Sequence, residues 1–223
     1  MKAHYCPVCD LEFDAFEAFN GRPSARCPFC KSLERHRLLW LYLNNETRYM
    51  QQRTRLLHFA PEKMLYNLFS SAPGISYQPV DLYPGAYPYP VHQADVTNIP
   101  FPSSTFDLAI CSHVLEHIDD DIRAMREIGR VLKPTGTALL QVPIDLRREV
   151  SYEDFRITTP EGRKKAFGQA DHVRIYGRDF VKRLQIAGLK VKVEFYADTY
   201  TPAEIETMGL MPGDVLFKIS LFV

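Results

Sequence analysis

The sequence has no excess charge of either sign, because 27 lysine and arginine residues balance 27 aspartate and glutamate residues among 223 positions. This balance argues against a nucleic-acid coat protein and against binding to anionic membranes through overall charge. Long apolar runs are also missing, since the longest, Leu38 to Leu43, is far shorter than the roughly 20 residues of a membrane span. No apolar segment of the signal-peptide kind follows Met1. We therefore expect a soluble, cytoplasmic protein without a membrane partner.

Cysteine is scarce, yet four of the five cysteines form two pairs with identical spacing, Cys6-Pro-Val-Cys9 and Cys27-Pro-Phe-Cys30. Seventeen residues separate the pairs, which is typical of four-cysteine zinc sites. Two residues between paired cysteines allow a tight turn to aim both sulfurs at one ion. Disulfides fit a reducing compartment poorly, and a redox motif is expected once, beside a βαβ unit. The sequence therefore predicts one structural zinc ion bound by Cys6, Cys9, Cys27 and Cys30.

The surroundings of these pairs set the predicted domain ranges. Asp10 and Lys31 follow the two pairs, where zinc-knuckle turns often have glycine. Ser32 is a suitable N-cap for a helix that continues to Leu43, and a polar connector follows it to Arg55. We expect a zinc module over residues 1–35, a linking helix and connector over 36–54, and the main domain over 55–223. Cys111 lies in an apolar stretch and is expected to be a buried thiol.

The main domain shows the alternation of short apolar strands and helices that is typical of an α/β fold with a mostly parallel sheet. Helices are expected at Glu62–Ser70, Asp119–Leu132 and Phe180–Ala187, and Lys133 to Gly136 is expected to form a turn. Strands are expected at Leu56–Ala60, Tyr77–Leu82, Val91–Val96, Phe106–His113, Thr137–Ile144, Lys190–Tyr196 and Val215–Val223.

Three motifs of this domain occur in the order found in a known enzyme family. They are Asp95-Val-Thr-Asn-Ile-Pro-Phe101, Phe106-Asp-Leu-Ala-Ile-Cys-Ser-His-Val-Leu-Glu-His117 and Arg130-Val-Leu-Lys-Pro-Thr-Gly136. The chain resembles class I S-adenosylmethionine-dependent methyltransferases, in particular the type 11 subgroup, some members of which carry a four-cysteine amino-terminal module. The resemblance implies a Rossmann-like seven-stranded sheet, S-adenosylmethionine as cofactor and methyltransferase activity.

The first loop departs from the family pattern, because Leu57 to Glu62 contains no glycine where the family has a glycine-rich turn. Two explanations stay open: the cofactor binds through an altered loop, or the domain has lost binding. The resemblance places the methionine part of the cofactor near the first loop, the ribose at the second strand end and the adenine after the third. The cofactor-binding residues implied are Phe59, Ala60, Glu62, Asp81, Leu82, Asp95, Val96 and His113.

Each of these residues also has a local explanation. Asp81 lies 21 residues after Ala60, near the spacing expected for a ribose-binding carboxylate, but it could equally stabilise a turn at the strand end. Asp95 could form an Asx turn before Thr97. His113 and His117 could share a helical face and bind a metal with Glu116. The His-Glu-x-x-His order of zinc proteases is absent, however, so capping and packing are the favoured roles.

The acceptor is less defined than the cofactor. The leading hypothesis is methyl transfer to a small-molecule or glycan-like acceptor beneath a lid formed by Asp145 to Arg178. His113 and His172 are the candidate catalytic residues, with His172 as a general base. One alternative is an RNA methyltransferase that reads nucleic acid with basic residues near the cysteines, and the other is a non-enzymatic binding protein. The basic residues concerned are Arg22, Arg26, Lys31, Arg35 and Arg37.

Overall fold

The computed structural model describes residues 4–222, which divide into two compact units. The first unit comprises residues 4–54, 61–77 and 193–216, and the second comprises residues 55–60, 78–192 and 217–222. The predicted domain ranges follow the chain in order, whereas these units are interleaved along it. No helix in this described part of the chain is both long enough and apolar enough to cross a membrane.

The first unit begins with two small antiparallel hairpins that sequence periodicity did not predict. Their strands have only three to five residues, too few for a clear alternation of apolar and polar positions. The second hairpin turns at Asn20 and Gly21, both with positive φ, as a tight hairpin turn requires. The paired strands are β1 (His4–Cys6) with β2 (Leu11–Phe13), and β3 (Glu17–Phe19) with β4 (Arg22–Arg26).

The first long helix, α1 (Glu34–Glu46), begins one residue later than the Ser32 cap predicts. Leu33 is the N-cap, and its backbone N–H donates to Nδ1 of His36 over 3.0 Å. The prediction of Ser32 as the cap is therefore wrong, because the Ser32 hydroxyl instead lies against cysteine sulfurs. The unit also contains α2 (Lys63–Ser71), α6 (Pro202–Met208) and the 3-10 turns η1 (Tyr49–Gln51) and η4 (Tyr196–Thr199).

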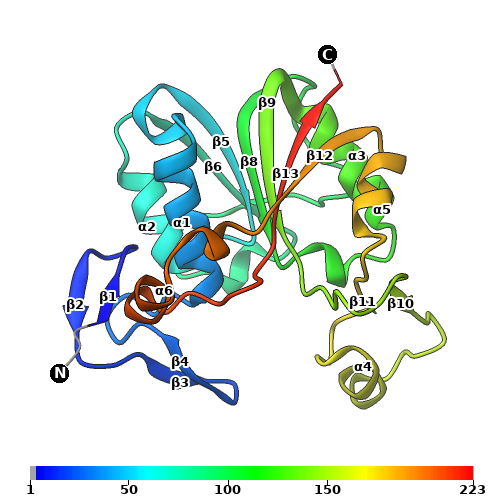
Figure 1. The fold of residues 1–223 in the computed structure, drawn as a ribbon. Helices are drawn as coiled ribbons and strands as arrows, with labels where there is room; N and C mark the ends of the chain where they lie inside the picture. The colour runs from blue at the N-terminus through cyan, green and yellow to red at the C-terminus, as the bar shows by residue number, and fades with distance from the viewer. Residues whose placement is uncertain (1–3, 223) are drawn as a thin grey trace. The chain divides into compact units, whose positions relative to one another are not determined.

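The main sheet has seven strands in the order β12-β13-β9-β8-β5-β6-β7 (Figure 1). β8 pairs in parallel with both β5 and β9, β6 pairs in parallel with β7, and β13 runs antiparallel to β9. This mixed sheet confirms the predicted Rossmann-like α/β fold. The strands are β5 (Thr54–Phe59), β6 (Ile75–Asp81), β7 (His92–Gln93), β8 (Phe106–Ser112), β9 (Leu132–Gln141), β12 (Leu189–Glu194) and β13 (Leu216–Leu221).

Two strands differ most from their predicted bounds. β9 starts at Leu132, so the predicted turn from Lys133 to Gly136 falls inside the strand. It forms an irregularity there, because Phe106 of β8 pairs with Leu132 whereas Leu108 pairs with Thr137. A Cβ at Gly136 would lie 2.8 Å from the carbonyl oxygen of Phe106, so close approach to β8 is what requires glycine there. β7 keeps only two residues of the predicted Val91–Val96 strand, because the chain turns around Asp95.

Helices α3 (Asp121–Val131) and α5 (Phe180–Ile186) lie side by side in the second unit (Figure 1). α3 packs close to the sheet at Gly129, where an added Cβ would lie 2.7 Å from Leu189. α5 contacts β13 through Phe180, whose ring centroid is 4.7 Å from that of Phe217. Between η3 (Leu115–His117) and α5, the chain includes α4 (Pro160–Phe167) and the antiparallel pair of β10 (Tyr152–Glu153) and β11 (Arg174–Ile175). The η2 turn (Pro84–Ala86) follows β6.

Candidate functional site

The four paired cysteines converge in the first unit, where all four sulfur atoms lie within 4.8 Å of one another. Cys6 Sγ is 3.6 Å from Cys30 Sγ, and Cys9 Sγ is 3.7 Å from Cys27 Sγ. A tetrahedron with Zn–S bonds of about 2.3 Å has sulfurs about 3.8 Å apart. The donor set and its spacing therefore fit four-thiolate coordination of one zinc ion, as the sequence predicts.

The two cysteine turns have the same backbone geometry. Asp10 donates its N–H to the Cys6 carbonyl over 2.8 Å, and Lys31 donates to the Cys27 carbonyl over 3.1 Å. Asp10 and Lys31 have φ values of 56° and 65°, the left-handed conformation that glycine adopts most readily. The missing glycines are thus replaced by residues in the glycine-like conformation, at a cost of about 1–2 kcal/mol each.

The Cys30 thiol and the Ser32 hydroxyl both stabilise negative charge on Cys6. The Ser32 hydroxyl lies 3.2 Å from both Cys6 Sγ and Cys30 Sγ. A hydrogen bond from the Cys30 thiol lowers the pKa of Cys6 to about 4, and the same bond raises the pKa of Cys30. The lowered pKa favours the thiolate form of Cys6, the form that binds zinc.

Arg37 is a fully buried cation in the same unit. Its guanidinium donates to the carbonyl oxygens of Ser32 over 2.7 Å and of Ala25 over 3.0 Å, and also to that of Gly209. It lies 4.3 Å from the ring centroid of Phe16. Burial lowers the pKa of Arg37, while negative charge on Cys6 opposes that change. Arg37 thus connects β4, the second cysteine turn and α6.

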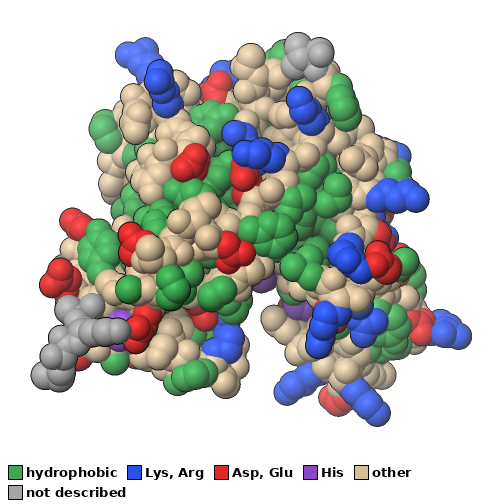
Figure 2. Space-filling model, in the orientation of Figure 1, with side chains coloured by type: hydrophobic (Ala, Val, Ile, Leu, Met, Phe, Trp, Pro, Cys, Tyr) green, Lys and Arg blue, Asp and Glu red, His purple; other side chains and the backbone are tan. Residues whose placement is uncertain are grey.

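The basic residues proposed for RNA binding are mostly paired with acids or buried. Glu17 accepts from Arg26 over 2.9 Å and from Lys31 over 3.1 Å. Arg22 pairs with Glu34 over 3.2 Å, Arg35 pairs with Glu62 over 3.7 Å, and Arg37 is occupied by backbone carbonyls. On the face shown in Figure 2, lysine and arginine side chains are spread out with acidic side chains among them. These pairs remove most of the local positive charge seen in the sequence.

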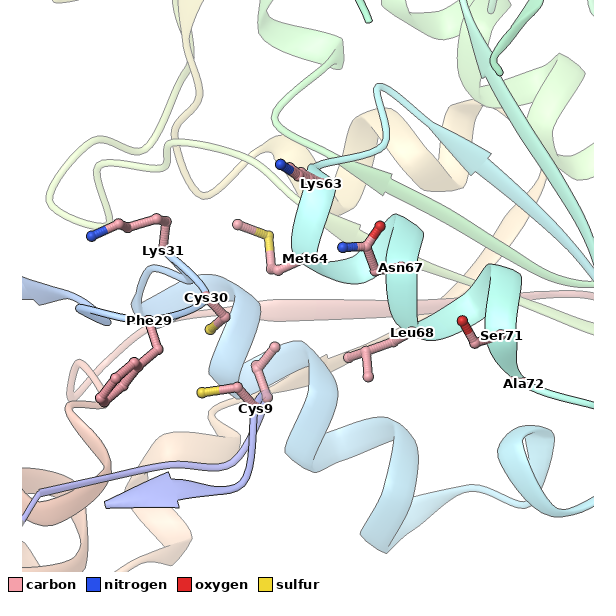
Figure 3. Close-up of a pocket in the computed structure, with 11 residues that line it drawn as sticks. Cys9, Phe29, Cys30, Lys31, Lys63, Met64, Asn67, Leu68, Ser71 and Ala72 are labelled. Atoms are coloured by element: carbon pink, nitrogen blue, oxygen red, sulfur yellow. The ribbon is translucent and has the colours of Figure 1, made fainter. Parts of the chain in front are cut away.

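Cys9 and Cys30 also line a pocket of about 560 Å³ in the first unit (Figure 3). Its opposite wall is formed by Met64, Asn67 and Leu68 of α2. Both cysteines are partly exposed, whereas Cys6 and Cys27 are fully buried. The two partly exposed cysteines of the cluster are therefore the ones that line this pocket.

Seven of the eight predicted cofactor residues lie in the second unit, at or just after the carboxyl ends of its strands, and the exception is Glu62. Ala60 follows β5 and donates its N–H to Val80 of β6 over 2.9 Å. Asp81 ends β6 and accepts at its carbonyl from Ala94, which follows β7, over 2.9 Å. Ligands of open α/β sheets bind outside this edge. The strand ends around Ala60, Asp81 and Ala94 are thus linked by backbone hydrogen bonds at the edge where a cofactor is expected.

The glycine-free first loop adopts a glycine-like conformation at Ala60, whose φ is 47°. Phe59 is 2% exposed, so its side chain belongs to the core and only its backbone can face a ligand. Glu62 lies in the first unit, where Oε1 is 2.9 Å from Nε2 of His36 and 3.7 Å from Nη2 of Arg35. Its carboxylate is therefore already engaged in that unit.

Asp81 makes two local hydrogen bonds. Oδ1 accepts from the backbone N–H of Tyr83 over 2.7 Å, and Oδ2 accepts from the hydroxyl of Tyr87 over 2.8 Å. The turn role considered from the sequence is therefore present. Each carboxylate oxygen has a second lone pair, so Asp81 keeps the capacity to accept from two ribose hydroxyls. Leu82, the next predicted residue, is 41% exposed.

Asp95 forms the Asx turn considered from the sequence. Its Oδ1 accepts from both the backbone N–H and the hydroxyl of Thr97, each over 2.8 Å. Its Oδ2 makes no hydrogen bond to any residue from 4 to 222 and is exposed. Val96 is 5% exposed, and Glu127 holds the loop by accepting from the N–H of Ile99 over 2.9 Å. Hydrogen bonds thus hold this loop, and Oδ2 of Asp95 stays available to a ligand as far as residues 4–222 are concerned.

The predicted catalytic histidines both lie near Glu116. His113 follows β8 with φ 54°, and its Nδ1 is 3.2 Å from Oε1 of Glu116. His172 is 3% exposed, and burial lowers its pKa. The ring of His172 meets that of His117 edge-on, with centroids 4.7 Å apart. The sequence did not signal this proximity, since 54 residues lie between His117 and His172.

The comparisons with known proteins agree with the fold and motifs. Residues 75–140 match the family described as "Methyltransferase domain". The matched segment includes Asp81, Asp95 and His113. An uncharacterized protein from Methanocaldococcus jannaschii is 38% identical over 66 residues, 29% of each chain. Demethylmenaquinone methyltransferase from Chlamydia muridarum is 36% identical over 59 residues, 26% of this chain and 24% of that one. The chain thus spans less than a third of the length of the curated relatives it matches.

A solved structure covers more of the chain. An S-adenosylmethionine-dependent methyltransferase from Mesorhizobium loti superposes with a TM-score of 0.55 at 19% identity, over 82% of this chain and 97% of that one. The predicted resemblance is confirmed: the chain has the fold of these methyltransferases and carries the family segment from β6 to β9.

Proposed function

We propose that this chain is an S-adenosylmethionine-dependent methyltransferase that binds its cofactor along the carboxyl ends of β5, β6 and β8 and at the turn after β7. The observation that carries the proposal is the linked edge formed by Ala60, Asp81 and Ala94. It lies where α/β folds bind nucleotides, and Asp81 and Ala94 fall within the matched family segment. The left-handed backbone at Ala60 answers the strongest objection, the lack of glycine in the first loop.

Different residues at this edge would bind different parts of the cofactor. Asp81 would accept hydrogen bonds from the ribose hydroxyls, while Oδ2 of Asp95 and the backbone of Val96 would meet the adenine. Ala60, with a single methyl group as side chain, would allow the methionine part close to the backbone. The cofactor supplies an activated methyl group, so the protein's main task is to align the acceptor with it.

We propose a small-molecule or glycan-like acceptor. The paired state of Arg22, Arg26 and Lys31 supports this choice over RNA, because little unpaired positive charge is left for phosphates. His113, partly exposed at the end of β8, is the proposed residue at the methyl-transfer site. His172 is a weaker candidate for a general base, since it is buried and its Nδ1 lies against the Phe167 carbonyl.

The proposal is tested by calorimetry with S-adenosylhomocysteine, the demethylated cofactor. Saturable binding with one site per chain is expected. Mass spectrometry of a metabolite extract incubated with isotopically labelled cofactor would then identify the acceptor. The absence of saturable binding would refute the methyltransferase assignment and favour the non-enzymatic alternative.

A further inference from the structure

Glu116 is a buried carboxylate without a hydrogen-bonding partner. Its residue is 0% exposed, and neither Oε1 nor Oε2 makes a hydrogen bond to any residue from 4 to 222. Nδ1 of His113 lies 3.2 Å from Oε1. Burying an ionised carboxylate costs several kcal/mol unless it is paired or binds a metal. Within residues 4–222, both buried oxygens of Glu116 are therefore available as ligand atoms.

Two further metal-ligand side chains surround this carboxylate. One ligand atom from each of Glu116, His117 and His172 lies within 4.8 Å of the others. Bonds of about 2.0–2.2 Å to a shared ion would place such atoms about 3–3.5 Å apart. Small side-chain rotations would bring the three ligand atoms to the separations expected around one ion.

The outer nitrogen of each histidine already has a partner. Nδ1 of His172 is 3.2 Å from the Phe167 carbonyl, which can only accept, so this nitrogen carries the proton. Nδ1 of His117 is 3.3 Å from Oδ2 of Asp171. Both rings therefore keep Nε2 unprotonated when neutral. Metal-binding histidines are typically oriented in this way by a carbonyl or a carboxylate.

Hydrogen bonds also fix the two segments that carry these residues. Val173 donates its N–H to the carbonyl of Glu116 over 2.9 Å. The carbonyl of Leu115 accepts from the Arg174 guanidinium over 3.2 Å and from the Tyr176 hydroxyl over 3.1 Å. Segment 172–176 is thus held against η3, and the three ligands sit on a preorganised frame.

We infer that Glu116, His117 and His172 bind a divalent first-row transition-metal ion, separate from the four-cysteine zinc site. Two imidazoles and one carboxylate suit Mn²⁺, Fe²⁺ or Zn²⁺ and leave coordination positions open. Glu116 is buried and His117 is partly exposed, so we expect the open coordination positions on the solvent side of the ion. The site would give the buried carboxylate oxygens of Glu116 a partner. It stands independently of the proposed methyl transfer, because metal binding is measured without a methyl acceptor.

The probe is Mn²⁺, which prefers oxygen and nitrogen ligands and binds thiolate clusters poorly. The full chain, purified with its zinc, is titrated with Mn²⁺ and the free ion is followed by electron paramagnetic resonance. About one Mn²⁺ per chain is expected to bind. Glu116→Gln and His117→Ala should each weaken binding at least tenfold, and Asp171→Asn about tenfold through the orientation of His117.

The matched control is His92→Ala, which removes an exposed histidine from β7 and should leave Mn²⁺ affinity unchanged. Zinc content and thermal melting of each variant separate loss of the site from loss of the fold. If Glu116→Gln does not fold, the Mn²⁺ affinity of His117→Ala decides the test, because His117 is only partly buried. The inference is overturned if the wild-type chain neither binds Mn²⁺ saturably nor holds a second Zn²⁺ besides the cysteine-bound ion, or if both ligand variants keep wild-type affinity. His113 would then be left as the partner of Glu116.

Discussion

Ala60 and His113 leave two neighbouring parallel strands in the same left-handed backbone conformation, with φ values of 47° and 54°. The register of β5 and β8 pairs Phe59 with Cys111, so the two residues follow the strands at nearly the same level. Neither is glycine, and such conformations cost about 1–3 kcal/mol each. Strained residues of this kind cluster at ligand sites, and these two lie on the edge proposed for the cofactor.

The backbone shape at Ala60, rather than its methyl group, should determine cofactor binding. Ala60→Gly is expected to keep S-adenosylhomocysteine affinity within about twofold and to change the free energy of unfolding by less than about 1 kcal/mol. Ala60→Val should destabilise the fold by about 1–2 kcal/mol more, because a β-branched residue resists positive φ. Calorimetry and urea unfolding measure both effects. Equal behaviour of the two variants would contradict the proposed role of this loop.

The four-cysteine cluster should hold one zinc ion that stabilises the first unit. Elemental analysis is expected to give about one zinc per chain, and Cys9→Ser to lower that content strongly. A strong chelator should make residues 4–54 sensitive to protease, because the metal supplies folding free energy. Cys111→Ala is the control, since this thiol is buried in β8, and should retain the zinc. A zinc-free chain that resists protease would refute the prediction.

Arg37 should contribute strongly to stability. Arg37→Ala removes the donors to the Ser32 and Ala25 carbonyls and should lower the free energy of unfolding by about 3 kcal/mol. Arg48→Ala, which truncates an exposed arginine just after α1, should change it by less than about 0.5 kcal/mol. Urea unfolding curves compare the variants. Similar losses in both would mean that the guanidinium does not organise this unit.

RNA binding by the first unit should be weak, because acidic residues neutralise its basic ones. A single-stranded RNA is expected to bind no tighter than about 10⁻⁴ M at physiological salt. Glu17→Gln would release Arg26 and Lys31 from their shared partner and should strengthen salt-dependent binding. Fluorescence anisotropy at two salt concentrations checks both expectations. Micromolar binding by the wild-type chain would revive the RNA alternative.

Much of the fold could be predicted from the sequence, because its signals are local. A short apolar run located the buried strand that the structure places at Phe106–Ser112. The repeated CxxC spacing located the four sulfurs that converge in the structure. The hairpins near the cysteines escaped prediction because strands of three residues have no measurable period. The prediction of Ser32 as a helix cap was wrong because its hydroxyl contacts cysteine sulfur and does not cap the helix.

The site depends more on contacts between distant residues. The proximity of His172 to His117 and Glu116 arises from hydrogen bonds of segment 172–176 to η3, and no local pattern encodes these. The pairing of Glu17 with Lys31 likewise requires the hairpin of β3 and β4. Residue types and spacing suggested a basic patch there, but the acidic residues that pair with it in the folded chain determine its net charge.

Asp81 offers the most direct test of the central claim, that the strand ends of the second unit bind S-adenosylmethionine. S-adenosylhomocysteine affinity is measured by isothermal titration calorimetry for the wild-type chain, for Asp81→Ala and for Glu12→Ala, which removes an exposed carboxylate from β2. Loss of two charge-assisted hydrogen bonds is expected to weaken binding by about 2–4 kcal/mol in Asp81→Ala. Glu12→Ala should bind like the wild type. Unchanged affinity in a folded Asp81→Ala variant would contradict the cofactor site proposed for this protein.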